Sequence, residues 1–302
     1  MIADSAIRTP LVRLNFSDAP AEIYLKLENL QPIGSFKIRG AANAIAHLQP
    51  EQLERGVVTA SAGNMAQGVA WCARKLGIPC TVIAPATAPD SKVSAVERLG
   101  GQVIKVTFDE WWKAFEQRSF PGIEGTFIHA FDDPFVVAGN GTIALEILED
   151  LSDVDAVVIP WGGGGLTCGI ASVLRELQPA CKVFTAEVAT AAPFAASLTA
   201  GVPTLVDYQP SWVDGIGSKG VFPQMFERAR DLVDGALVAE LPSIENALRS
   251  MAHHNHIIAE GAGACPVACA LSGNAGRGKI VCIISGGNIN PTNLAHILKN
   301  DF

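Results

Sequence analysis

The sequence lacks the long apolar run that a membrane-spanning helix needs. Such a helix takes about 18 or more consecutive apolar residues, whereas the apolar runs at residues 156–161 and 279–285 are only as long as a strand. The sequence also lacks a stripe of lysines and arginines, since 22 basic side chains stand against 30 acidic ones for a net charge of -8. We therefore expect neither a membrane nor a nucleic acid as partner.

Paired cysteine spacing is absent as well. The seven cysteines are an odd number without the spacing of a disulfide framework or a zinc site, which favours reduced thiols inside a cell. No basic flank followed by an apolar stretch opens the chain, so no signal peptide is predicted. With 49% hydrophobic and 17% charged residues, we expect a globular cytoplasmic protein of about two domains that acts on a small molecule.

Short apolar or β-branched runs alternate with longer segments of helical period. Strands are expected at residues 57–60, 80–84, 102–106, 156–160, 182–187 and 279–285, and helices at 65–76, 90–99 and 109–117. This alternation predicts an α/β fold class, with two doubly wound domains and mostly parallel sheets. Because turn residues interrupt the pattern near residues 132–134, we predict a small domain at 47–132 and a large domain at 1–46 plus 133–302.

Four consecutive glycines, Gly162, Gly163, Gly164 and Gly165, stand between an expected strand and a helix. Each glycine costs about 0.5–1 kcal/mol relative to alanine, so bare backbone must be needed there. Exposed amides at a helix N-terminus favour a phosphate group. An ordinary tight turn is the alternative, although it normally needs only one or two glycines.

The kind of phosphate ligand stays open on this loop alone. A dinucleotide fingerprint requires a third glycine where this chain has Thr167 or Cys168, and the Lys-Ser/Thr pair of a nucleoside triphosphate loop is absent. Glu187, at the end of the next strand, would suit a ribose hydroxyl. An NAD-dependent oxidoreductase therefore remains an alternative.

Three other segments carry polar groups at element ends. Lys37 opens a helix among apolar neighbours and near Arg39, where burial lowers an amine pKa enough for it to form a Schiff base; a surface lysine is the alternative. The segment of Ser61, Ala62, Gly63 and Asn64 offers amides for a carboxylate, or is a simple turn and helix cap. Ser285 ends an apolar strand, where its hydroxyl faces a ring nitrogen or caps the last helix.

In this order, the segments resemble the fold-type-II pyridoxal-phosphate enzymes of the threonine dehydratase and serine racemase branch. The resemblance covers nearly the whole chain and includes residues 9–11, 25–28, 35–40, 61–67, 87–89, 133–134, 138–139, 141–146, 162–165 and 285–288. It implies a tryptophan synthase β-like fold and pyridoxal 5'-phosphate (PLP) as cofactor. We expect a homodimer.

The resemblance also implies a role for each candidate residue. Lys37 would bind the cofactor covalently, with Phe36 beside the ring and Asn64 bonded to its 3'-oxygen. The four glycines would hold the phosphate, Ser285 the pyridine nitrogen, and Glu260 and the loop at residues 214–217 would approach the ring. The substrate carboxylate would be bound by Ser61, Ala62, Gly63, Asn64 and Met65.

The implied reaction is the dehydration of a β-hydroxy amino acid (L-threonine, L-serine or L-phenylserine) to a 2-oxo acid and ammonia, with Lys37 removing the α-proton. An amino acid racemase of the same family is an alternative, but Ala62 replaces the second serine of racemases. Met65 replaces a frequent histidine and favours a bulkier substrate such as phenylserine. Because Pro193 replaces one carboxylate of the racemase cation site near Glu187, no metal is expected. A catalytically silent binding protein is the last hypothesis.

Overall fold

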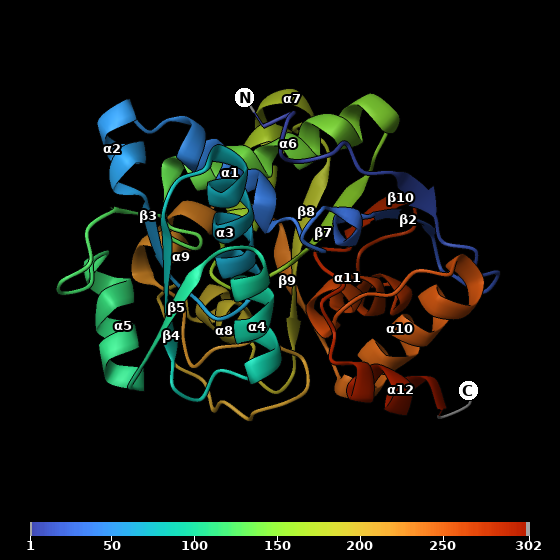
Figure 1. Ribbon diagram of the computed structural model, residues 1–302. Helices are drawn as coiled ribbons and strands as arrows, with labels where there is room; N and C mark the ends of the chain where they lie inside the picture. Colours follow the sequence, from blue (N-terminus) through green and yellow to red (C-terminus); the bar gives the residue numbers. More distant parts are fainter. Residues whose placement is uncertain (1, 300–302) are drawn as a thin grey trace. The chain divides into compact units, whose positions relative to one another are not determined.

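The computed structural model describes residues 2–299, which form two compact units (Figure 1). Unit 1 contains the residues up to Ile7 together with Gln31–Asn140, and unit 2 contains Arg8–Leu30 and the residues from Gly141 onward. The chain passes from unit 1 to unit 2 within α6 (Pro134–Asp150). Each unit holds helices around a mostly parallel sheet, so the predicted α/β fold class is confirmed.

Unit 1 is built on a parallel sheet with the strand order β5-β4-β3-β6. Its strands are β3 (Val57–Ala60), β4 (Cys80–Pro85), β5 (Gln102–Val106) and β6 (Thr126–Phe127), and its helices are α1 (Lys37–Ala46), α2 (Pro50–Arg55), α3 (Asn64–Leu76), α4 (Asp90–Arg98) and α5 (Phe108–Gln117). β3 is buried along its whole length, as an inner strand covered on both faces must be. α3 ends at Gly77, whose φ of +69° favours glycine.

Unit 2 is built on a larger sheet with the order β1-β2-β10-β7-β8-β9, in which only the β1–β2 pair is antiparallel among the pairs of described strands. Its strands are β1 (Leu11–Arg13), β2 (Glu22–Lys26), β7 (Ala156–Pro160), β8 (Lys182–Val188), β9 (Gly235–Ala239) and β10 (Lys279–Ile283). Its helical segments are η1 (Glu28–Leu30), α7 (Gly165–Leu177), α8 (Pro193–Ala200), α9 (Pro223–Ala229), α10 (Leu241–Asn255), α11 (Gly261–Leu271) and α12 (Pro291–Lys299).

The core of unit 2 surrounds α11, which packs against β7, β8 and β10. Residues 261–270 of this helix are all buried, which is expected of a helix that is apolar on every side. β7 and β10 are neighbours in the sheet. Their carboxyl ends therefore lie side by side, and the glycine run and Ser285 follow these two ends. No helix within residues 2–299 combines the length and apolar character that a bilayer crossing requires.

All six predicted strands form, whereas β1, β2, β6 and β9 were not predicted. β3, β5 and β7 have the predicted bounds, whereas β10 ends at Ile283 and leaves Ser285 in the following loop. α1 packs against α3, and residues 31–46 accordingly belong to the same compact unit as residues 47–132. The sequence had placed these residues with the larger domain, because the contact of α1 with α3 has no local signature.

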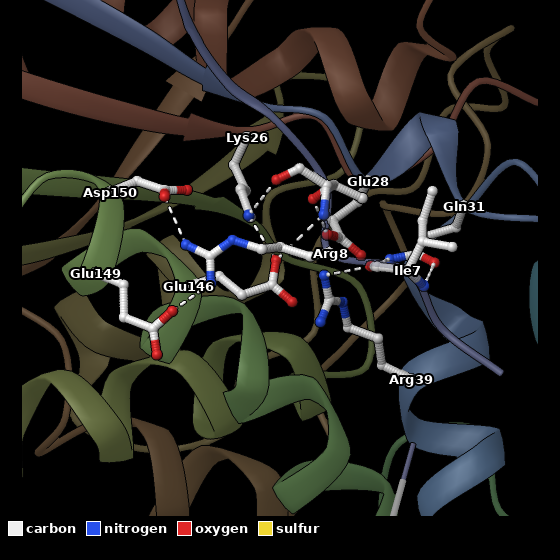
Figure 2. A network of polar contacts seen from close by, with 10 residues as sticks. Ile7, Arg8, Lys26, Glu28, Gln31, Arg39, Glu146, Glu149 and Asp150 are labelled. Carbon is white, nitrogen blue, oxygen red and sulfur yellow. Dashed lines mark hydrogen bonds and ion pairs between the residues drawn. The ribbon is translucent and has the colours of Figure 1, made fainter. Parts of the chain in front are cut away.

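A buried polar network in unit 2 involves three segments of the family resemblance, at residues 9–11, 25–28 and 141–146 (Figure 2). The Nζ of Lys26 has no exposed surface and donates to the Thr9 carbonyl at 2.7 Å and to Glu146 Oε2 at 2.6 Å. Thr9 Oγ1 in turn donates to Glu28 Oε1 at 2.6 Å. A buried charge is tolerated only when it is paired and hydrogen-bonded, and Glu146 and the Thr9 carbonyl meet this requirement for Lys26. In unit 1, Arg39 donates to the Ile7 carbonyl.

Candidate active site

Lys37 is the first residue of α1 and lies in unit 1. Its backbone N–H is 3.3 Å from Ser35 Oγ, and its side-chain Nζ lies 5.1 Å from the centre of the Phe36 ring. Nζ also donates to the carbonyl of Ala130 at 2.7 Å. The amine is thus held by an aromatic face and a carbonyl oxygen, both of which favour a cation.

The segment predicted to bind a carboxylate lies at the start of α3. Ser61 Oγ accepts the N–H of Gly63 at 3.2 Å, and Asn64 is the first helical residue. A Cβ on Gly68, one turn further, would lie 3.3 Å from the Lys37 carbonyl, so the first turns of α1 and α3 are in close contact. Unit 1 therefore brings Lys37 close to the N-terminal end of α3. The Met65 side chain is only 2% exposed and belongs to the apolar core of this unit.

A turn from His129 to Asp132 adjoins Lys37, and sequence reasoning missed it. The His129 ring is 5% exposed, and its Nδ1 accepts the N–H of Phe131 at 3.3 Å and of Asp132 at 2.8 Å. Burial lowers the pKa of His129 to about 4, with Arg118 and Lys37 also lowering it and Asp132 opposing them. In the sequence, His129 stands three residues before the Asp-Asp-Pro turn, and this turn predicted only a domain boundary.

The glycine run lies in unit 2 between β7 and α7. Gly164 caps α7 with a φ of +87°, and a Cβ there would lie 2.7 Å from the ring of buried Trp161. A Cβ on Gly162 would lie 2.6 Å from the carbonyl oxygen of Gly215. Both distances are shorter than Cβ contacts in proteins, so these two positions require bare backbone, and the amides at the start of α7 stay open to a ligand.

The other candidate segments of unit 2 lie near the same loop. Gly215 has a φ of +85°, and a Cβ on it would lie 3.9 Å from Glu260 Oε1. The N–H of Glu260 donates to the Gly286 carbonyl at 2.9 Å, directly after buried Ser285. A continuous series of contacts thus runs from Gly162 through Gly215 and Glu260 to the segment of Ser285. This series lies at the carboxyl ends of β7 and β10, where open α/β sheets bind ligands.

These residues fit the groups of PLP. The phosphate requires amides without side chains, which the glycine run supplies, and the ring nitrogen requires a hydroxyl partner such as that of Ser285. Thr167, on the first turn of α7, has a buried Oγ1 without a hydrogen-bond partner among the described residues. An unpartnered buried hydroxyl is costly, and a phosphate oxygen at the glycine run would satisfy it. From the sequence alone, Thr167 indicated only that the loop lacks the third glycine of a dinucleotide fingerprint.

Glu187 is fully buried and binds the start of α8 instead of facing a ligand. Its two carboxylate oxygens accept the N–H groups of Phe194 at 2.9 Å and Ala195 at 2.7 Å. Burial raises the pKa of Glu187 to about 7, against the lowering effect of these hydrogen bonds. Within residues 2–299, no three His, Cys, Asp or Glu side chains are grouped so that they could hold a metal ion.

The comparison with known families settles the family. Residues 2–286 match the model of the pyridoxal-phosphate dependent enzymes. This chain belongs to that family. The predicted resemblance and the predicted cofactor, PLP, are therefore confirmed, and the NAD-dependent alternative is set aside.

Similar proteins of this family include an L-threonine ammonia-lyase and an L-threonine dehydratase. The chain is 44% identical over 281 residues to the L-threonine ammonia-lyase of Thermotoga maritima. This match covers 92% of this chain and 70% of that enzyme. It is 38% identical over 303 residues to a catabolic L-threonine dehydratase of Staphylococcus aureus, covering 97% and 87%.

Two solved structures have the same fold. Threonine deaminase isoform 2 from Solanum lycopersicum superposes with a TM-score of 0.89 at 33% identity, covering 99% of this chain and 89% of that one. Maize serine racemase also gives 0.89, at 31% identity with 99% and 93% covered. Both branches named in the sequence resemblance, dehydratase and racemase, are thus among the similar structures.

Proposed function

We propose that this chain is a PLP-dependent ammonia-lyase that dehydrates a β-hydroxy amino acid to a 2-oxo acid and ammonia. The observation that carries the proposal is the Lys37 amine, which lies at the start of α1 beside the Phe36 ring and bonded to the Ala130 carbonyl. The similarity to an L-threonine ammonia-lyase and an L-threonine dehydratase supports the lyase reaction.

Each candidate residue has a separate role toward the cofactor or the substrate. PLP, when bound, accepts the electron pair that remains at the α-carbon after proton removal. Lys37 would bind its aldehyde carbon, the amides of the glycine run its phosphate, and Ser285 its ring nitrogen. The amides at the start of α3 would hold the substrate carboxylate, because the N-terminus of a helix carries about half a positive charge.

The proton that leaves the α-carbon goes to Nζ of Lys37. To act as this base, the Lys37 amine would have to be free of the cofactor and close to the α-carbon. The carbonyl of Ala130, 2.7 Å from Nζ, stabilises the ammonium that forms. The ammonium of Lys37 would give this proton to the departing β-hydroxyl, which leaves as water. Hydrolysis of the remaining unsaturated amine then gives the 2-oxo acid and ammonia.

Racemisation is less well supported than elimination. A racemase needs an acid on the face of the substrate opposite to the lysine, and Ala62 has no hydroxyl for this role. Ser61, the neighbouring residue with a hydroxyl, uses its Oγ to accept the N–H of Gly63. We therefore propose that this chain releases 2-oxo acid faster than it forms the D-amino acid.

An aromatic substrate is a specific candidate. The His129 ring lies 4.3 Å from the Phe115 ring and 4.8 Å from the Phe131 ring, measured between centroids. Ala130, which contacts the Lys37 amine, stands between two of these rings in the chain. We infer that an aromatic β-substituent packs well beside Lys37, and L-phenylserine is the substrate that this arrangement favours over L-serine.

One set of assays tests the function and the substrate together. The purified chain, reconstituted with PLP, is given L-serine, L-threonine and L-phenylserine, and 2-oxo acid, ammonia and D-amino acid are measured. Steady 2-oxo acid release that is lost in Lys37→Ala and kept in Lys113→Ala, an exposed lysine of unit 1, supports the lyase. D-amino acid as the main product would favour the racemase, and no turnover of any kind would favour a binding protein. The expected homodimer and cytoplasmic location stay predictions.

A further inference from the structure

The turn from His129 to Asp132 is fixed on both sides within unit 1. Before it, Thr59 Oγ1 on β3 donates to the carbonyl of Ile128 at 2.9 Å. After it, Asp132 Oδ2 lies 2.5 Å from Arg118 Nη2, and Asp133 Oδ1 accepts the N–H of Val136 at the start of α6. The backbone between these anchors therefore has little freedom, and the ring of His129 occupies its centre.

The protonation of the His129 ring follows from its partners. Backbone amides can only donate, so Nδ1, which faces the N–H groups of Phe131 and Asp132, must be unprotonated. The proton of the neutral ring is thus on Nε2, and His129 cannot accept a substrate proton through Nδ1 without breaking the turn. His129 instead holds the backbone of the turn in one conformation, and this conformation fixes the direction of the Ala130 carbonyl.

We propose that His129 is a positioning residue that fixes the Ala130 carbonyl as the acceptor for the Lys37 amine whenever that amine is not covalently bound. The two hydrogen bonds to Nδ1 close the turn around Ala130, and the Ala130 oxygen lies 2.7 Å from Nζ. The catalytic meaning of this arrangement rests on the proposed function, because a base that is released during turnover must return to one place. The contact itself is independent of any reaction.

The charged groups around His129 come from three segments. Lys37 belongs to α1, Arg118 follows α5, and Asp132 belongs to the turn itself. The aromatic rings near His129 include those of Phe115, Phe127 and Phe131. Replacements of His129 can therefore separate the acceptor at Nδ1 from the packing of the ring.

Three variants make this separation. His129→Asn places an amide oxygen near the position of Nδ1, since asparagine side chains accept N–H groups two residues on. His129→Gln carries the same amide one bond further away, and His129→Phe keeps the aromatic packing without an acceptor. Thermal unfolding of each variant reports whether unit 1 still folds. If His129→Phe does not fold, His129→Gln serves as the variant that lacks an acceptor at the position of Nδ1.

The first readout is the reactivity of Lys37 in the full chain freed of cofactor. Competitive acetylation at pH 8, read by mass spectrometry, gives the rate for Lys37 relative to exposed Lys113. A carbonyl acceptor stabilises the charged form of an amine and holds it away from the reagent. Loss of one such hydrogen bond, at about 0.5–1.5 kcal/mol, corresponds to an increase in labelling of about threefold or more. We expect this increase in His129→Phe and His129→Gln, and a ratio close to that of the parent chain in His129→Asn.

The second readout uses the enzyme loaded with PLP. We expect kcat to fall in His129→Phe and His129→Gln and to be restored in His129→Asn, with a smaller change in KM. Unchanged Lys37 labelling in His129→Phe, or equal labelling in His129→Asn and His129→Gln, would overturn the positioning role. Because labelling needs no substrate, it also separates failure of this inference from failure of the proposed lyase reaction.

Discussion

Replacing Gly164 by alanine should remove the phosphate cradle, and the structure gives the size of the effect. At a φ of +87°, an L-residue costs about 1–2 kcal/mol. The new methyl group would also lie 2.7 Å from Trp161. Trp161 cannot move away easily, because it is buried and stacked on Phe194 with ring centroids 3.7 Å apart. Forced contacts of this kind cost about 1–3 kcal/mol, so we expect a total loss of about 2–5 kcal/mol in the free energy of unfolding.

Gly201→Ala is the matched control. Gly201 has a φ of +74° at the end of α8, and no described atom lies within 4 Å of a Cβ placed there. This variant should therefore lose only the backbone cost of about 1–2 kcal/mol and keep its affinity for PLP. Urea unfolding and fluorescence titration with PLP are measured for both variants. Equal losses of stability, together with unchanged PLP affinity in Gly164→Ala, would show that neither the contact with Trp161 nor the open amides require glycine at this position.

Three other predictions follow from single side chains. Lys26→Met leaves Glu146 without its buried partner, and urea unfolding should show a loss of about 3–5 kcal/mol, whereas a loss below 1 kcal/mol would contradict the pairing. The pKa of His129 is lowered from 6.5 to about 4, so between these pH values the unfolded chain binds a proton that the folded chain does not bind. The free energy of unfolding should therefore fall by about 3 kcal/mol as the pH falls from 6.5 to 4. His129→Asn should show a smaller fall in urea titrations over this pH range. Glu187→Ala removes both acceptors at the start of α8 and should lower the unfolding temperature without weakening PLP binding, and a lost affinity would place Glu187 in the site.

The inner strands were predictable because their signal is local. Continuous β-branched or apolar runs such as residues 57–60 and 156–160 coincide with β3 and β7, as expected for strands covered on both faces. β2 escaped prediction because it contains Lys26, a charge that sequence patterns assign to the surface. Its burial depends on Glu146, which lies 120 residues further along the chain. No local pattern contains such a pairing.

In the candidate site, too, the local features were predictable from the sequence and the long-range contacts were not. Phe36 lies beside the Lys37 amine, and its predicted place beside the cofactor ring stays a prediction. The glycine run leads from β7 into α7, as the sequence predicted. The reason that Gly162 must be bare, the carbonyl of Gly215, was not visible in the sequence because the two residues meet only in the folded unit. The turn at His129 was missed for the same reason, since 93 residues separate Lys37 from Ala130.

The proposed lyase reaction depends on a covalent bond between PLP and Lys37. Borohydride reduction of the PLP-loaded chain, followed by peptide mass spectrometry, locates this bond. We expect a single reduced pyridoxyl adduct on Lys37, which disappears in Lys37→Ala. An adduct on another lysine, or no adduct on a chain that is fully loaded and absorbs as a bound aldehyde cofactor, would show that Lys37 does not bind PLP.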